Sequence, residues 1–339
     1  MLVDIILFAA GLILAWLTLR DVFDTVVVPG GSRASLQVTR RVGMALLAIW
    51  KQVRGRKRGI SDSFAPLVLV SSFAIWMSLL AMGFGLMAFA ARRSFTPPIH
   101  DMGDAVYQAG GAMLTVGLSN HYPGGAGRWI ILAAGFCGLA VMTMAVTYLL
   151  EVQSSIARRD IGIIKLNTSG GDPPSALTML ERFAALHLER EIEEVLKEGR
   201  NWCATVRQSH SAHPSLIYFK SISTGAGWPA ALGAILDLGL IAEHLLDDPA
   251  LYGPAVLLRD EGARMARELA LMARVEPKPI ESSAGQLQQL ASRLASSGYR
   301  LKDTPNFEAM SQQRAAHQAC VEALADHLGR PATVLIRQS

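Results

Sequence analysis

The chain has little of what catalytic or metal-binding domains are usually built from. Three widely separated cysteines suggest neither a disulfide framework nor a zinc site; they are Cys137, Cys203 and Cys320. No Gly-x-Gly-x-x-Gly motif follows a strand-like run, and no nucleophile–base grouping or phosphate loop stands out. We therefore expect no catalytic residues, no bound cofactor and no nucleotide-binding α/β domain.

Charge is scarce as well. Only 18% of the 339 residues are Asp, Glu, Lys or Arg, whereas 51% are hydrophobic. The mean hydropathy of +0.29 is high for a soluble protein and too low for a protein that lies wholly in lipid. This composition predicts a membrane part and a sizeable soluble part.

Three apolar runs are long enough to cross a bilayer, which takes about 20 helical residues. They are Leu2–Leu19, Phe64–Ala91 and Trp129–Leu150. A cleaved signal peptide would have basic residues ahead of its apolar region. Asp4 stands there instead, so we favour a retained transmembrane helix over a cleaved signal. The apolar run 42–50 is too short to span, and we expect it at the membrane interface or packed as a helix.

The basic residues indicate the topology. Residues 33–58 hold eight Lys or Arg and no Asp or Glu. Aromatic or motif support for nucleic-acid binding is missing, so this run favours a cytoplasmic loop beside the spans. Three spans then place the N-terminus outside and the long C-terminal part in the cytoplasm. We expect a multi-pass protein of a bacterial inner membrane.

The segment 104–123, between the second and third spans, is too short and too rich in glycine to cross a membrane. Asp101 or Asp104 can cap a helix that runs to about Leu114. Residues Thr115–Ser119 follow this helix. Such a half-helix with an irregular segment is how a membrane protein lines a narrow ion path, because closely spaced carbonyl oxygens replace the water that a cation loses.

This segment resembles the filter of the potassium-channel pore-loop superfamily, which usually reads Thr-Val-Gly-Tyr-Gly-Asp. Thr115, Val116 and Gly117 fit that pattern. The resemblance extends from about Phe64 to Val152, less than a third of the chain. It implies permeation of K⁺ as the only bound metal. It also implies a homotetramer, because one chain supplies one loop and a closed carbonyl ring takes four.

Three filter positions depart from the pattern, and they leave K⁺ selectivity open. Leu118 replaces Tyr, Ser119 stands in place of the second Gly, and Asn120 stands in place of the Asp. The second Gly is left-handed in the family, where a Cβ costs roughly 1–2 kcal/mol. Further on, Gly138 occupies the position of the family's hinge glycine. Close helix packing is the alternative, and Gly135 three residues earlier makes it credible.

The C-terminal half has helical periodicity without alternating strands. We expect a short strand or connector at 161–167, then a linker at 168–174 with Asp172 as the next helix N-cap. A long amphipathic run starts at Leu177 and continues through Leu196. Further helices are expected at Trp228–Leu246, Pro254–Ala273, Ser282–Ser297 and Pro305–Leu328.

Polar residues in this half have structural and functional readings. His210 and His213 have a spacing that suits a metal on one helical face, but Pro214 follows directly, so a packed turn is favoured. Asp237 lies in an apolar helix, where it is expected to pair with Lys220 or His210 or to belong to a ligand pocket. Scattered positions between residues 202 and 237 resemble the all-helical tail of a bacterial two-span-pore channel family.

The sequence therefore predicts an all-α membrane protein with a pore-loop domain. The expected parts are an N-terminal transmembrane helix and basic segment (1–62), a pore domain (63–153), and a linker with a helical cytosolic domain (154–339). The expected function is a potassium-channel-like cation channel gated through the cytosolic domain. The alternatives are a weakly selective cation channel and a non-conducting tetrameric membrane sensor or scaffold. Expected partners are further copies, membrane lipid and an unidentified cytosolic ligand or protein, but not nucleic acid.

Overall fold

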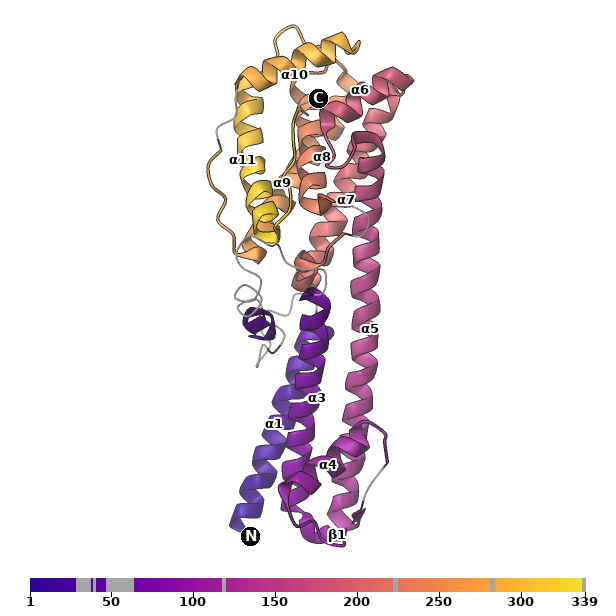
Figure 1. Cartoon of the computed structure of the whole chain (residues 1–339), viewed down its shortest axis with the longest axis vertical. Helices are drawn as coiled ribbons and strands as arrows, with labels where there is room; N and C mark the ends of the chain where they lie inside the picture. The colour runs from indigo at the N-terminus through magenta and orange to yellow at the C-terminus, as the bar shows by residue number, and fades with distance from the viewer. Residues whose placement is uncertain are drawn as a thin grey trace. The chain divides into compact units, whose positions relative to one another are not determined.

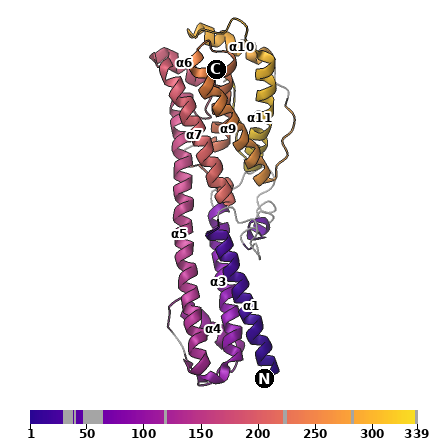
Figure 2. The same cartoon turned by 180° about the vertical axis from the view of Figure 1, so that it is seen from behind.

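The computed structural model describes residues 1–28, 38, 41–46, 64–117, 120–221, 225–280 and 284–336 (Figures 1 and 2). The described residues up to Val152 form one compact unit, and those from Gln153 onward form a second. In the described residues of both units, helix is almost the only regular structure, which confirms the expected all-α fold.

The first unit consists of long apolar helices and one short helix. Its elements are α1 (Leu2–Val26), α3 (Phe64–Ala90), η1 (Arg92–Ser94), β1 (Phe95–Thr96), α4 (Met102–Met113), β2 (Tyr122–Pro123) and the first part of α5 (Gly125–Gly170). Among the described residues, α1, α3 and α5 are long and apolar enough to cross a membrane, which confirms the three expected spans. Of the expected interfacial run 42–50, residues 42–46 are helical and the rest lie outside the described residues.

Helices α1 and α3 pack closely because small residues face each other. A Cβ added to Gly83 would lie only 3.0 Å from the carbonyl oxygen of Gly11. The same pair of helices buries a carboxylate. Asp21 is fully buried, and its Oδ2 accepts a hydrogen bond of 2.9 Å from Nε1 of Trp76. This bond satisfies a polar group that would otherwise be costly to bury.

Helix α5 is longer than the sequence suggested. It runs unbroken for 46 residues, so the expected strand or connector at 161–167 is wrong. The apolar span does give way to polar residues near Glu151, but the helical burial pattern continues beyond it. One stripe stays buried at spacings of three and four: Val152, Ser155, Arg159, Ile163 and Leu166.

The second unit is a bundle with its own hydrophobic core. Its further elements are α6 (Ala176–Leu186), η2 (Glu189–Glu191), α7 (Ile192–Ala212), η3 (Pro214–Tyr218), α8 (Gly227–His244), α9 (Pro249–Ala273), α10 (Ala284–Ser296) and α11 (Phe307–Leu328). All 18 residues of α8 are buried, and α6, α7, α9 and α11 contact it (Figure 1). The expected positions of α8, α10 and α11 are confirmed within two residues at each end, whereas α9 begins at Pro249, five residues before the expected start at Pro254.

The run expected from Leu177 to Leu196 is two helices rather than one. His187 ends α6 in the left-handed conformation, with φ of +56°. Its neighbours are apolar and helix-forming, so hydrophobic periodicity carries no sign of this break.

The N-cap of α6 also differs from the expectation. Ser175 caps the helix by accepting from the backbone N–H of Thr178, whereas Asp172 does not cap it. The carboxylate of Asp172 accepts from the backbone N–H groups of Gly225 at 2.8 Å and Ala226 at 3.3 Å. The carboxylate that the local sequence assigned to the next helix therefore binds backbone groups more than 50 residues further along the chain.

Candidate ion-conduction site

The short helix α4 begins as its sequence predicts. Asp101 is its N-cap, and its Oδ1 accepts from the backbone N–H of Asp104 at 2.9 Å. The second acid lies in the first turn, where negative charge suits the helix dipole. The helix ends at Met113, so the partial negative charge of its carboxyl end lies beside residues 115–117.

Glycines of the two flanking helices let α4 approach closely. A Cβ on Gly85 of α3 would lie 2.6 Å from a methyl carbon of Val106. On α5, a Cβ on Gly138 would lie 2.6 Å from the carbonyl oxygen of Met113. These contacts give Gly138 a packing role against the end of α4. A hinge at this position stays a prediction.

The chain after α4 makes a tight, strained turn. Val116 donates its backbone N–H to the carbonyl of Gly111 at 2.9 Å. Thr115 has a φ of +57° and Gly117 a φ of +72°. A left-handed β-branched residue costs on the order of 1–3 kcal/mol and persists only where its surroundings hold it. Sequence reasoning expected the strain at Ser119, which lies with Leu118 outside the described residues.

The residues of this turn face outward in a single copy of the chain. Val116 is 54% exposed, and Thr115 and Gly117 are exposed too. Asn120, the expected filter flank, is also exposed. The segment therefore leaves polar backbone groups uncovered by its own chain, as a segment that completes a shared path would.

His121 anchors the exit of the segment, and sequence reasoning missed it. Its Nδ1 lies 2.8 Å from the carbonyl oxygen of Pro97, and its Nε2 lies 3.6 Å from Oδ2 of Asp104. Beside it, β2 pairs with β1 in antiparallel register, Thr96 opposite Tyr122. One imidazole thus ties the exit to the turn after α3 and lies beside the start of α4. Its position after a filter-like segment was the available signal.

The span in α5 keeps a broad apolar face that its own chain leaves uncovered. The exposed side chains on it include Leu132, Phe136, Leu139, Val146 and Leu150. Two hydroxyls on this span, Thr143 and Thr147, bond back to carbonyls one turn earlier at 2.9 and 3.1 Å. Such a face suits lipid or further copies of the chain.

The polar residues of the second unit are arranged differently from the expectation. Asp237 is fully buried and pairs with Arg314 (Nε–Oδ1 2.9 Å) and His317 (Nε2–Oδ1 3.2 Å), not with Lys220 or His210. Burial opposes its ionisation, but Arg314 and His317 outweigh it and lower the Asp237 pKa. No metal-binding cluster of His, Cys, Asp or Glu occurs within the described residues.

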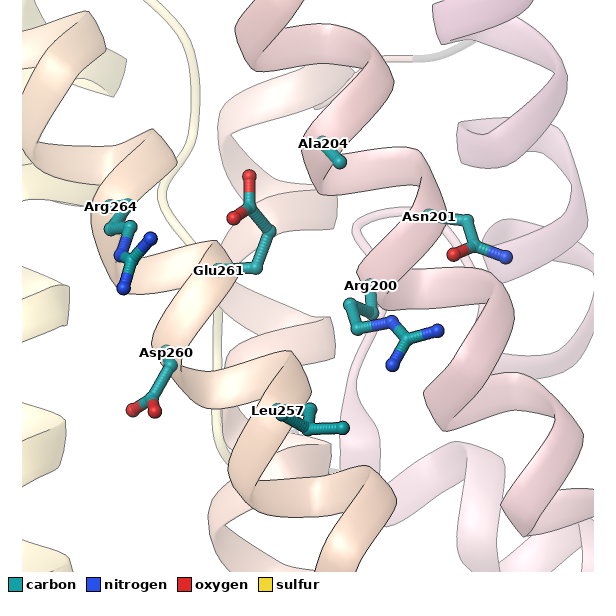
Figure 3. Close-up of a pocket in the computed structure, with 7 residues that line it drawn as sticks. All are labelled: Arg200, Asn201, Ala204, Leu257, Asp260, Glu261 and Arg264. Carbon is teal, nitrogen blue, oxygen red and sulfur yellow. The ribbon is translucent and has the colours of Figure 1, made fainter.

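A shallow cleft of about 260 Å³ lies between α7 and α9 (Figure 3). Its lining residues are Arg200, Asn201, Ala204, Leu257, Asp260, Glu261 and Arg264. Both acids are already paired, Asp260 with Arg259 at 3.1 Å and Glu261 with Arg207 at 2.6 Å. Because both acids of the cleft are already engaged, we assign it no function.

Comparison with known proteins agrees with the site. Residues 67–154, from α3 through the turn to α5, match a protein-family model described as "Ion channel". No curated protein and no solved structure matches the chain. The family match covers less than half of the chain and confirms, for that part, the resemblance to the pore-loop ion-channel superfamily.

Proposed function

We propose that four copies of this chain form a potassium-channel-like cation channel. The observation that carries the proposal is the strained turn at residues 115–117, which follows the carboxyl end of α4 between two apolar helices. In the proposed mechanism, residues Thr115–Ser119 are the selectivity filter and Asn120 is its flank. Their carbonyl oxygens take the place of the water that K⁺ loses, and permeation is passive. K⁺ is the cargo, and we propose no cofactor.

The proposed location is an inner membrane, with the N-terminus outside and the second unit in the cytoplasm. The basic stretch 33–58 supports this orientation. Helix α5 would be the inner helix, with Gly138 as the proposed bending point. Because α5 contributes residues to both units, we propose that a conformational change in the helical unit reaches the inner helix through it.

Potassium flux into liposomes that contain the purified protein tests the proposal. Gly117→Asp should abolish the flux, because a side chain and a negative charge then stand in the filter. Gly253→Asp is the matched control, since a Cβ there meets nothing within 4 Å in α9. Flux that survives Gly117→Asp intact would contradict the assigned path.

A weakly selective cation channel is the second candidate, and Ser119 and Asn120 are the observations that favour it. Reversal potentials in mixed K⁺ and Na⁺ separate the two. Restoring Gly at 119 and Asp at 120 should sharpen selectivity if these residues impair the filter.

A non-conducting tetrameric scaffold is the third candidate. Absence of conductance under all conditions, together with a tight cytosolic partner, would favour it over both channels.

A further inference from the structure

Buried polar atoms without partners gather in the second unit. Four side chains there are 1% exposed, and each has one atom with no hydrogen-bond partner in the part of the chain that the structure describes. These atoms are Arg159 Nη2, His210 Nε2, Ser221 Oγ and Trp228 Nε1. Buried polar groups in native proteins are nearly always hydrogen-bonded, so such a set needs an explanation.

Arg159 is fixed on α5 with one edge of its guanidinium group left over. Its Nε bonds to Oδ1 of Asp160 at 3.0 Å, and its Nη1 donates to the carbonyl of Leu216 at 3.3 Å. Trp202 holds the backbone at this point by donating its Nε1–H to the carbonyl of Arg159 at 2.9 Å. The remaining nitrogen, Nη2, is a charged and immobilised donor.

His210 on α7 contributes an acceptor rather than a donor. Its Nδ1 lies 2.8 Å from the carbonyl oxygen of Val206, and a carbonyl can only accept, so Nδ1 carries the hydrogen. Burial and the positive charge of Arg159 lower the pKa of His210 to about 3. The ring is therefore neutral at physiological pH, and its Nε2 is a bare acceptor.

Trp228 lies beside His210, and Arg330 lies beside the neighbouring Gly227. The ring of Trp228, in the first turn of α8, lies 5.8 Å from the ring of His210, and its Nε1–H can only donate. A Cβ added to Gly227 would lie 2.8 Å from Nη1 of Arg330. Burial lowers the pKa of Arg159, Asp160 opposes this shift, and the charge of Arg330 lowers the pKa further.

We propose that Arg159, His210 and Trp228, with Arg330 beside them, bind a small oxyanion that carries a proton, with hydrogen phosphate as its type. The guanidinium and indole N–H groups donate to its charged oxygens, which gives strong charge-assisted bonds. Its P–OH group donates to Nε2 of His210. Two guanidinium groups exclude a cation. Sulfate has the same shape but no proton at neutral pH, so it leaves the imidazole acceptor unpaired.

The site would regulate the channel, and this step rests on the proposed function. Arg159 lies on α5, His210 on α7 and Trp228 on α8. An anion that accepts bonds from two of these helices and donates to the third stabilises one packing of α5 against the bundle. Because α5 continues from the inner helix, occupancy would shift the balance between closed and open states.

Calorimetric titration of inorganic phosphate into the full-length protein in detergent at pH 7.5 tests the binding step. Trp228→Phe keeps the ring and removes one donor, and it should weaken binding about tenfold. Arg159→Gln should weaken it further if the variant folds. Arg264→Gln, in the cleft of Figure 3, is the control that should bind as the unmodified protein does. Absence of binding, or equal affinity in Trp228→Phe, would overturn the proposal.

A comparison of phosphate with anions that lack a P–OH group tests the role of His210. The unmodified protein should bind phosphate at least about tenfold more tightly than sulfate, because only phosphate donates to Nε2. His210→Phe should abolish this preference. Methyl phosphate, whose dianion has no hydroxyl group at this pH, should resemble sulfate. Equal affinity of the unmodified protein for phosphate and either comparison anion would contradict the assignment.

Flux measurements keep this proposal separate from the proposed function. Phosphate inside the compartment that holds the second unit should change K⁺ flux in the unmodified protein, and Trp228→Phe should need about tenfold more phosphate for the same change. Phosphate binding without any K⁺ flux would refute the channel but keep the site. Flux without phosphate binding would refute the site alone.

Discussion

The two units of this chain are stabilised in opposite ways. In the most apolar 18-residue stretches of α1, α3 and α5, the chain itself buries only 17%, 39% and 22% of the residues. In the second unit, α8 is buried along its whole length and ion pairs are enclosed in the core. The first unit thus leaves apolar surface for lipid or further copies to cover, whereas the second encloses a hydrophobic core of its own.

The difference extends to how each unit uses its polar residues. The first unit places small residues where helices approach, as Gly11, Gly83 and Gly138 show, and strains its backbone at Thr115. The second unit pairs a buried carboxylate with two side chains inside the bundle, at Asp237. Substitutions should therefore act through steric fit at Gly138 and through uncompensated charge at Asp237.

The largest effect is expected at Asp237. Asp237→Ala leaves Arg314 buried without its counter-charge and should destabilise the second unit by about 3–5 kcal/mol. Thermal unfolding followed by tryptophan fluorescence measures this loss, and Trp202 and Trp228 are the two of the six tryptophans that lie in that unit. Asp260→Ala is the matched control, because Asp260 is 54% exposed and its pair with Arg259 should contribute at most about 1 kcal/mol. Equal shifts in the two variants would refute the contrast.

The pH dependence of this effect has a definite sign. The folded pKa of Asp237 is lowered by Arg314 and His317, against the opposing effect of burial. Its ionised form therefore stabilises the fold above the unfolded pKa of about 3.9, and this contribution is lost as the pH falls through the folded pKa. The difference in unfolding midpoint between the unmodified protein and Asp237→Asn should stay constant from pH 7 to about 4 and narrow below that.

A steric effect of intermediate size is expected at Gly138. Gly138→Val forces side-chain carbons against the carbonyl of Met113 and should cost about 1–3 kcal/mol in the packing of α4 on α5. K⁺ flux should fall, while tryptophan-monitored unfolding of the second unit stays unchanged. Gly135→Ala is the control, since its Cβ would lie at an ordinary 3.4 Å from the nearest atom. Normal flux in Gly138→Val would remove the packing role.

The same contrast explains how far the sequence alone could predict the structure. The spans and α4 follow from apolar run length and from Asp101, which are local signals. The second unit was less predictable because its decisive contacts are long-range. Asp172 accepts a hydrogen bond from Gly225, 53 positions away. Asp237 accepts one from Arg314, 77 positions away. Neither pairing leaves a trace in local periodicity.

Within the candidate site, sequence reasoning found the segment but missed part of its support. The strain at Thr115 depends on hydrogen bonds back to α4, such as that from Val116 to Gly111, which no motif encodes. The length of α5 was missed because the charged pair at 158 and 159 resembled the end of a span. Arg159 is in fact 1% exposed, and only the packed bundle shows why helix continues around it.

The smallest effect is expected at His121, and it tests whether the support of the proposed filter reaches beyond α4. His121→Leu removes the 2.8 Å contact with the carbonyl of Pro97 and the nearby imidazole at Asp104. The free energy that holds this segment in place should fall by about 0.5–1.5 kcal/mol. Carried over to ion selection, this corresponds to a fall of about two- to tenfold in the K⁺ to Na⁺ permeability ratio measured by reversal potential. His100→Leu is the control, because His100 is exposed on the same loop. An unchanged ratio in His121→Leu would limit the support of the filter to α4 and its packing on α3 and α5.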